Sequence, residues 1–426
     1  MAAGALRARR LAIAGALSLA ALAPPAGPAT AAEHLFSGIF DLRLFSSNAD
    51  EPWLAGGLDK LRLGRADEPL ALVQALIEYR GRWSETVSAK VTAALYDGQE
   101  RPVNLTEAYL EYAPVPRSAW RLRARAGAFY PPVSFENTGT GWTSPYTLSF
   151  SAIDTWIAEE VRIGGAEVEG RHLGRFTGSS DDVAFTAAAF QANDPAGALI
   201  SWRGWALHER QTGLFETLPL AHLPAFADTG SFPPQQPFEK PFVELDHRWG
   251  YYATVEWNHL ESWRVRALHY DNRGDPTIIH GGQWGWRTRF DHFGWQWRPA
   301  PHTELLAQAL LGTTEMEGFS GPLVYARFWS AYLLASQQVD RHRWSARLDV
   351  FGVRDEDHTP DDPNREHGHA LTLAYFFTLA DPAHRGAWRL GAESLLVRSD
   401  RPARRLFAGA SSRAERSLQL VVQYQF

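Results

Sequence analysis

The chain has 426 residues, no cysteine and a formal net charge of −6 at pH 7. Without cysteine, neither a disulfide scaffold nor lipid attachment through a cysteine is possible. After the first residues, no apolar run reaches the about 18 residues that a membrane-crossing helix needs, and the basic patches are too small for a nucleic-acid partner.

The first 31 residues predict a secretory signal peptide. Arginines at positions 7, 9 and 10 precede an apolar run that starts at Leu11, and the small residues Ala29-Thr30-Ala31 follow as a cleavage site. Removal of this segment takes away three positive charges and no negative one, so the net charge goes from −6 to −9. We therefore expect an exported protein whose single domain covers residues 32–426.

Along the rest of the chain, apolar and polar residues alternate with period two, which predicts β-strands and no helix. In the last segment, for example, Leu418, Leu420 and Val422 alternate with Gln419 and Gln423. The sixteen predicted strands lie near residues 35–45, 69–82, 84–96, 104–113, 119–130, 162–171, 182–191, 250–260, 262–271, 282–297, 302–314, 322–337, 341–354, 366–380, 386–399 and 415–426.

The predicted connections alternate between tight turns and long loops. Short periplasmic turns, long extracellular loops and an even number of strands are typical of outer-membrane barrels. Residues 199–210 also have strand character, but an additional strand would make the number odd, so we place them inside one long loop, 192–249. Tight turns are predicted near 81–84, 114–118, 261, 299–301, 338–340 and 381–385, a looser one at 172–181, and long loops at 46–68, 131–161, 192–249, 355–365 and 400–414.

The apolar face of these strands predicts contact with lipid. It carries tryptophans near strand ends, as an aromatic girdle does, at Trp284, Trp286, Trp344 and Trp388. A closed barrel is required because lipid cannot satisfy the free backbone groups of a sheet edge. The terminal Phe426 is typical of the final strand that barrels present to their assembly machinery. We predict an all-β transmembrane antiparallel barrel in the outer membrane of a Gram-negative cell.

Three arginines on one side of a predicted strand indicate an aqueous lumen. Arg121, Arg123 and Arg125 alternate with small apolar residues. An arginine that faces lipid at mid-membrane costs about 2–4 kcal/mol, so three would cost roughly 6–12 kcal/mol. This cost is comparable to the about 5–15 kcal/mol by which a whole domain is stable. The arginine face must therefore look into water inside the barrel.

The neighbouring strand carries acids on the same predicted face. A hairpin that turns at 114–118 would set Glu111 opposite Arg121 and Glu107 opposite Arg125. It would leave Arg123 without a directly opposed acid.

Two further charged clusters are predicted on the lumen side. They comprise Glu256, Asn258, Arg264 and Arg266 around the turn at 261, and Arg287, Arg289 and Asp291 on the next strand. Two interpretations are open. The charges brace the wall as cross-strand pairs, or unpaired guanidinium groups hold phosphate-like oxygens and attract anions.

At this point the chain resembles the phosphate-selective porin O/P family of outer membranes. The resemblance is carried by LTEAYLEYAP (105–114), RARAGAFYPPVSFEN (123–137), GWTSPYTLSFSAIDTWIAEE (141–160), RIGGAEVEG (162–170) and the final VVQYQF. It implies a sixteen-stranded barrel, commonly a homotrimer, that passes small anions by diffusion. Members of that family use lysines with an arginine ladder, whereas this chain has three lysines, Lys60, Lys90 and Lys240.

Within this interpretation, the 192–249 loop is a candidate for a segment that narrows the pore. Arg203, His208, Glu209 and Arg210 are the candidate residues of the constriction, together with the 131–161 loop. The alternative is that both loops cap the extracellular mouth or pack against neighbouring subunits.

Other functions have weaker support in the sequence. A barrel phospholipase needs Ser and His together on the lipid face, but the outward Ser330 and the histidine candidates His292 and His369 lie on strands that are not adjacent. His367 and His369 share a face without an evident third metal ligand. An adhesin or structural barrel would need a lumen filled by bulky side chains. We expect no cofactor, no metal and no catalysis, and a passive channel in contact with lipid and small solutes.

Overall fold

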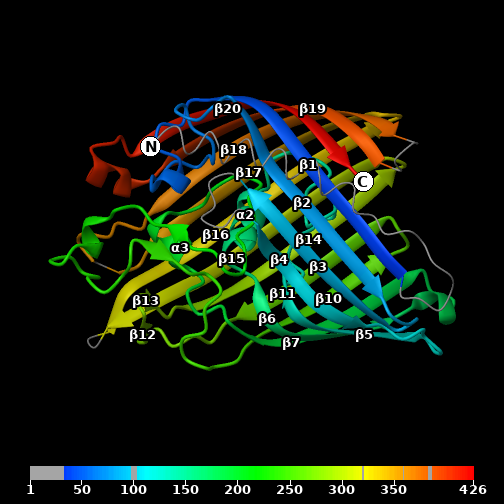
Figure 1. Ribbon diagram of the computed structural model, residues 1–426. Helices are drawn as coiled ribbons and strands as arrows, with labels where there is room; N and C mark the ends of the chain where they lie inside the picture. The colour runs from blue at the N-terminus through cyan, green and yellow to red at the C-terminus, as the bar shows by residue number, and fades with distance from the viewer. Residues whose placement is uncertain (1–32, 97–102, 319–320, 358, 382–385) are drawn as a thin grey trace.

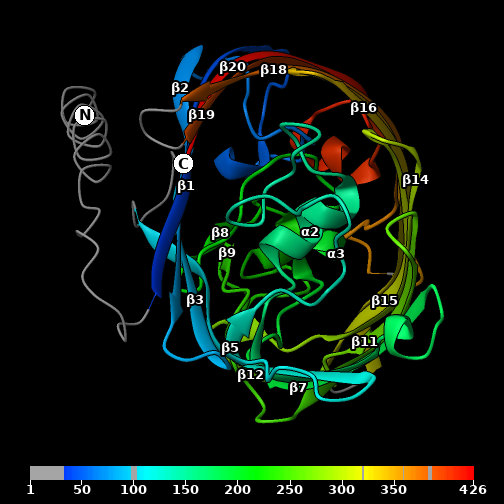
Figure 2. The same ribbon diagram turned by 90° about the vertical axis from the view of Figure 1, so that its right-hand side faces the viewer.

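Sixteen strands pair in chain order into one closed antiparallel barrel, as predicted (Figure 1, Figure 2). The computed structural model describes residues 33–96, 103–318, 321–357, 359–381 and 386–426. The predicted signal peptide at 1–31 and most of the predicted turn at 381–385 lie outside the described residues. β1 and β20 close the ring, with Ile39 opposite Gln425 and Ser47 opposite Ser417.

The predicted strand bounds agree with the structure to within five residues. The barrel consists of β1 (Glu33–Ser47), β2 (Leu70–Arg82), β3 (Val87–Tyr96), β4 (Asn104–Tyr112), β5 (Trp120–Phe129), β6 (Ile163–His172), β7 (Asp181–Gln191), β10 (Gly250–His259), β11 (Trp263–Asp271), β14 (Arg287–Ala300), β15 (Thr303–Gly318), β16 (Gly321–Val339), β17 (His342–Asp355), β18 (Glu366–Asp381), β19 (Gly386–Asp400) and β20 (Ser412–Gln425).

The long loops contain short elements of their own. Two small hairpins pair β8 (Leu218–Pro219) with β9 (Phe238–Glu239) and β12 (Ile279–His280) with β13 (Gln283–Trp284). The α-helices are α2 (Ala152–Glu159) and α3 (Ala198–Trp202), and the 3₁₀ helices are η1 (Trp53–Ala55), η2 (Gly174–Phe176), η3 (Pro224–Phe226) and η4 (Pro402–Phe407). The expectation of no helix was therefore wrong. None of the helices in the described ranges has the length and apolar character needed to cross a membrane.

The outer face carries the predicted aromatic girdle at its periplasmic end. Trp344 and Trp388 are exposed there, as expected, and Trp344 packs beside Tyr375 with 5.8 Å between ring centroids. Trp263 and Trp297 stack at 5.3 Å on the same level. The C-terminus lies at this end, where the short turns are found (Figure 1).

Phe426 helps to close the barrel. Its backbone N–H donates to the Gly38 carbonyl oxygen at 3.1 Å and its own carbonyl accepts from the Gly38 N–H at 2.9 Å. The Phe426 ring stacks on Phe40 of the first strand at 6.0 Å. The final residue thus joins the last strand to the first.

Two predictions about outward and inward faces were wrong around β14. Trp284 and Trp286 lie before this strand, in an extracellular loop, and are buried there, with the Trp286 ring 5.0 Å from that of Trp202. Arg287 and Arg289 point outward rather than into the lumen, because they share a face with the exposed Phe293. β14 has 14 residues, whereas about 9–11 suffice to cross the apolar layer. The outward charges therefore lie above the lipid-facing band.

Candidate functional site

The three arginines of β5 point into the barrel, on the face opposite to the exposed Leu122. Their strand register differs from the prediction. Glu111 lies opposite Arg125 rather than Arg121, because pairing between β4 and β5 ends at Tyr112. Pro114 and its neighbour Pro116 have no N–H to extend the ladder, so the hairpin opens earlier than expected.

All three arginines are ion-paired, mainly to acids of β6. Arg125 donates to both oxygens of Glu167 at 2.8 and 2.9 Å, and Arg121 lies 3.4 Å from Glu169. Arg123 lies directly opposite Glu169 in the ladder and within 3.7 Å of Glu111 and Glu169 and 3.4 Å of Glu167. The prediction that Arg123 has no opposed acid was therefore wrong.

The predicted cluster near residue 261 joins the same network. Arg171 links the two halves, since it donates to Glu256 of β10 at 2.7 Å and lies 3.3 Å from Glu169. Arg264 and Arg266 both donate to Glu256 from β11. The hairpin register between β4 and β5 does not predict the role of Arg171, because this residue lies on β6, on the other side of β5.

Glu107 does not pair with Arg125 as predicted. It lies opposite Thr92 of β3, and its carboxylate accepts from Lys90 Nζ at 2.7 Å. Lys90 also lies 3.2 Å from Glu78. The acids on both sides of the arginine face are therefore already committed to cations of neighbouring strands.

These ion pairs turn their positive ends toward the periplasmic opening. The side chains of five lumen arginines are 33% to 63% exposed, whereas the six carboxylates that pair with them are 2% to 25% exposed. The arginines are Arg80, Arg121, Arg123, Arg264 and Arg298, and their partners are Glu78, Glu111, Glu167, Glu169, Glu256 and Glu304. A solute that enters from this side meets guanidinium groups first. We call this surface the arginine vestibule.

The lumen above the arginine vestibule is filled by two inner segments, residues 130–162 with α2 and residues 192–213 with α3 (Figure 2). α2 begins at Ser151, whose hydroxyl accepts from the Asp154 N–H at 3.1 Å. Trp156 of α2 packs against Phe290 and Phe328 of the wall with ring centroids 5.5 and 5.1 Å away. The barrel thus has a hydrophobic core of its own inside the wall.

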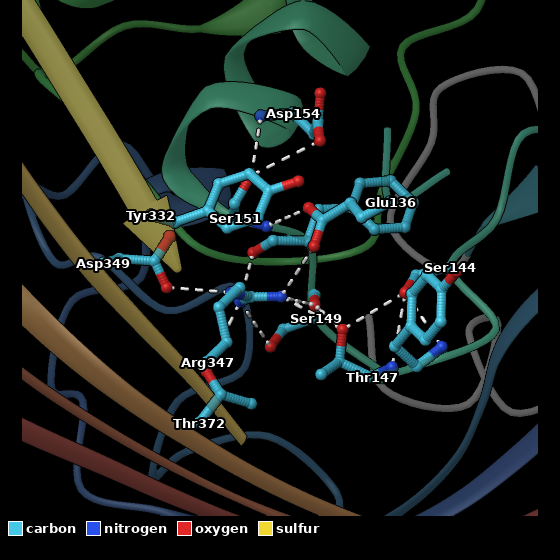
Figure 3. Close-up of polar contacts among 12 residues, drawn as sticks. Glu136, Ser144, Thr147, Ser149, Ser151, Asp154, Tyr332, Arg347, Asp349 and Thr372 are labelled. Carbon is cyan, nitrogen blue, oxygen red and sulfur yellow. Dashed lines mark hydrogen bonds and ion pairs between the residues drawn. The ribbon is translucent and has the colours of Figure 1, made fainter. Parts of the chain in front are cut away.

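Arg347 of β17 ties the first inner segment to the wall (Figure 3). Its guanidinium donates to Asp349 at 2.8 Å and to Glu136 at 3.2 Å, and it also donates to the carbonyl oxygens of Ser149 and Phe150 at 2.7 and 2.8 Å. This arginine is fully buried. A single wall residue therefore satisfies acceptors over 15 positions of the segment, from residue 136 to residue 150.

The buried carboxyl of Asp154 lies beside this contact (Figure 3). Burial, and then the nearby Glu136, raises its pKa well above the usual range. The Ser134 hydroxyl donates to Asp154 at 3.0 Å. Asp154 therefore favours its protonated form more than an exposed aspartate does.

The four predicted constriction residues are buried ion-pair partners rather than the rim of a passage. Arg203 donates to both oxygens of Glu159 at 2.5 and 2.6 Å, and His208 contacts the same carboxylate at 2.8 Å. Burial by itself would raise the pKa of Glu159, but Arg203 and His208 lower it to about 2. Burial lowers the pKa of His208. This cluster holds the second inner segment against α2.

The remaining two predicted constriction residues also contact charged partners. Glu209 binds Arg62 and lies 3.4 Å from Arg43 of β1. Arg210 forms an ion pair with Glu216 of its own loop. In this structure these charges hold the second inner segment inside the barrel.

In this conformation the lumen is closed at mid-height. Among the described strands, inward side chains around the ring are no more than 5% exposed at Asp41, Gln74, Thr92, Glu107, Glu167, Tyr252, Leu268, His292, Gln308, Tyr332, Arg347, Thr372 and Gln423. A water-filled passage would leave such side chains exposed. The inner segments must therefore shift before a solute can cross.

The described residues hold one group of carboxylates close enough to share a metal ion. Asp194, Glu244 and Asp246 of the long extracellular loop have oxygens within 4.8 Å of one another. Burial, together with the charges of Asp246 and Glu244, raises the pKa of Asp194 to about 7. Asp194 also accepts from the backbone N–H of Leu245, so backbone donors already satisfy part of this cluster.

The residues considered for other activities lie apart. Ser330 points into the lumen and donates to the Val350 carbonyl oxygen at 3.1 Å, so its predicted outward position was wrong. His292 is also inward and buried, beside Gln308 at 2.9 Å. His367 and His369 do share the outer face of β18, as expected. These groups do not form the lipid-facing Ser–His pair of a barrel phospholipase.

Comparison with known proteins supports the fold. No family model matches the chain, and no curated protein matches its sequence. Among solved structures it is similar to the outer membrane channel DcaP of Acinetobacter baumannii, with 9% identity and a TM-score of 0.54 over 95% of this chain and 100% of that one. It is also similar to Salmonella typhi OmpF, solved with daunomycin, with 11% identity and a TM-score of 0.50 over 92% and 97% of the two chains.

The closed barrel, the lipid-facing girdle and these similarities define the class. The chain has the closed β-barrel fold of outer-membrane channels. More narrowly, it has the sixteen-stranded architecture of a porin.

Proposed function

We propose that the protein is a passive diffusion channel for small hydrophilic solutes and that it favours anions. One observation carries the proposal. The arginine vestibule presents positive ends of ion pairs to the solvent while their carboxylates lie behind them. The acids compensate the arginine charges, and the outward position of the guanidinium groups makes the surface attractive to anions.

The orientation of the pairs matters more than their net charge. A guanidinium about 4 Å from a passing anion attracts it by about 4 kcal/mol at an effective dielectric constant near 20, and a carboxylate about 8 Å away opposes this by about 2 kcal/mol. The difference of about 2 kcal/mol favours anions and disfavours cations equally. The anion-attracting interpretation of the sequence is thus compatible with cross-strand pairing, and phosphate-like solutes are included in the proposed range.

Passage requires the inner segments to move, because the described conformation is closed at mid-height. The segments lie outside the strand ladder that holds the wall, and side chains such as Arg347 join them to the wall strands. Displacement of the segments can therefore occur without opening the barrel.

We further propose the location and the partners that the barrel class implies, and the location is the outer membrane of a Gram-negative cell. The outward apolar band contacts lipid, the final strand ending in Phe426 is recognised by the barrel-assembly machinery, and the working unit is a homotrimer. Residues 32–426 form the single domain of the mature chain, and cleavage after residue 31 precedes its export.

The test is the reversal potential of the purified protein in planar bilayers under a salt gradient. We expect conductance with anion preference, and cation preference would refute the arginine vestibule as the selectivity element. A companion liposome-swelling assay reports passage of uncharged solutes.

A second candidate function is supported by the filled lumen itself. A barrel whose interior is a packed core, with Trp156 against Phe290 and Phe328, is also compatible with a structural or adhesive role. Absence of conductance, even after the inner segments have been loosened by mutation, would favour this candidate over the channel.

A further inference from the structure

A second group of lumen arginines differs from the arginine vestibule because it has no acids. Arg341, Arg343 and Arg389 line a cavity of about 190 Å³ at the periplasmic end, between β17, β18, β19 and the tip of the first inner segment. No aspartate or glutamate lines this cavity. Among the described residues, none of these three arginines forms an ion pair.

Arg389 is buried and has a neutral partner. It is 7% exposed, and its one hydrogen bond to a described residue goes to the Pro145 carbonyl oxygen at 2.5 Å. The Phe376 ring lies 3.4 Å from its guanidinium carbon, which fixes the plane of the group. A buried cation without a counterion is costly, so this guanidinium is incompletely satisfied by the chain itself.

Arg343 is the neighbouring cation and is also held by neutral groups. It donates to Ser336 at 3.0 Å and to Gln338 at 2.6 Å, and the Tyr146 ring lies 5.3 Å from its guanidinium carbon. The charged groups that act on Arg389 are Arg343, a like charge, and Asp41. Two guanidinium groups are therefore preoriented toward one cavity.

The nearby acids are already occupied. Asp41 accepts from Arg43 at 2.9 and 2.6 Å, from Gln74 at 3.0 Å and from Gln423 at 2.9 Å. Glu304 accepts from Arg298 at 3.0 Å and from the Tyr146 hydroxyl. Neither carboxylate is available to neutralise the cavity, so the missing counterion must come from solution.

We propose that this cavity binds a small oxyanion, such as sulfate, phosphate or a short carboxylate, between Arg343 and Arg389. Guanidinium groups bind planar or tetrahedral oxyanions through paired, charge-assisted hydrogen bonds. The cavity of about 190 Å³ has the volume of about six water molecules, which admits such an anion. This inference rests on the proposed function and extends it, because it gives the anion channel a saturable binding site on its periplasmic side.

The test uses the absence of cysteine in the natural chain. Thr378 lines the cavity and is exposed, so Thr378→Cys supplies a single thiol there. The rate at which this thiol is modified is measured with an anionic and with a cationic methanethiosulfonate of similar size. Each rate is divided by the rate of the same reagent with a free thiol in solution. Sodium sulfate is then titrated at an ionic strength held constant with sodium chloride.

We expect the anionic reagent to react faster, and sulfate to slow it in a saturable way. In the T378C background, Arg389→Gln should lower the anionic-to-cationic rate ratio roughly tenfold and raise the half-saturating sulfate concentration roughly tenfold. Arg398→Gln, on the outer face of the same strand, is the matched control and should leave both values unchanged.

Equal rates for the two reagents, or a sulfate effect that persists in Arg389→Gln, would overturn the proposal. If Arg389→Gln fails to fold, Arg343→Gln is measured instead, with the same expected loss. The assay needs no ionic current. If sulfate protects Thr378→Cys but the protein never conducts, the channel is refuted and the anion site is retained. If the protein conducts but sulfate gives no protection, the anion site is refuted and the channel is retained.

Discussion

Replacement of Arg347 by glutamine should release the first inner segment while the barrel stays closed. The wild-type guanidinium contacts two carboxylates, Glu136 and Asp349, and two backbone carbonyls of the segment. Removal of one partner from a buried ion pair costs about 3–5 kcal/mol, because the remaining charge is left uncompensated. Every 1.4 kcal/mol is a factor of ten, so the equilibrium between seated and released segment should shift by roughly a hundredfold to a few thousandfold.

The assay combines single-channel conductance with the gel mobility of unheated protein. Glutamine keeps one amide that can donate to Ser149 or Phe150, so the effect is on charge rather than on volume. The mutant should show a larger or more frequent open conductance than the wild type, and its unheated form should still migrate as a folded barrel. Arg354→Gln, an exposed arginine of the same strand that lies 3.8 Å from Glu356, is the matched control and should behave as the wild type.

Two results would contradict this reasoning. Unchanged conductance with an intact barrel would mean that Arg347 does not hold the segment. Loss of the folded form would mean that the inner core stabilises the wall itself, so that the segment and the barrel cannot be separated energetically. Faster proteolysis within residues 130–162, measured on the folded mutant, distinguishes a released segment from a merely repacked one.

Three further outcomes are expected from other parts of the molecule. Arg123→Gln leaves Glu111, Glu167 and Glu169 less compensated, so the anion-to-cation permeability ratio from reversal potentials should fall roughly tenfold, and an unchanged ratio would argue against the arginine vestibule. Asp194 has its pKa raised to about 7 by burial and by Asp246 and Glu244, so its contribution to loop stability is present at low pH and is lost as the pH rises through about 7. Protease cleavage within 192–249 should therefore be faster above about pH 7 than at low pH. Asp194→Asn should remove this dependence on pH. Gly127 has a φ of 138°, and a Cβ there would lie 2.3 Å from the Ala108 carbonyl oxygen, so Gly127→Ala should lower the temperature at which the barrel unfolds on gels. Gly178→Ala, at a φ of 73° with open space around it, should lower that temperature less.

Period-two alternation was sufficient to predict the wall. Side chains on a strand alternate between two faces whatever the neighbours are, and lipid requires one face to be apolar and the ring to be closed. This is why all sixteen strands, the inward arginines at 121, 123 and 125 and the outward Trp344 and Trp388 could be predicted from sequence.

Height along a strand does not follow from alternation. Arg287 and Arg289 alternate as cleanly as the arginines of β5, yet they lie on the outer face above the apolar band. The sequence pattern shows which residues share a face, but which face looks outward depends on where the strand crosses the membrane. The same limit explains Trp284 and Trp286, which pack inside an extracellular loop.

Partner choice and the filling of the lumen were decided by the tertiary structure. Arg123 meets Glu167 and Glu169 of β6, a strand separated from it by the long 130–162 loop. The arginines without acids, Arg343 and Arg389, become neighbours through strand pairing over distances that no local pattern records. Sequence by itself determined a closed wall with a charged interior, because alternation is a local property. Whether that interior is open or closed, and which charges are left without a counterion, depends on how distant segments meet inside it.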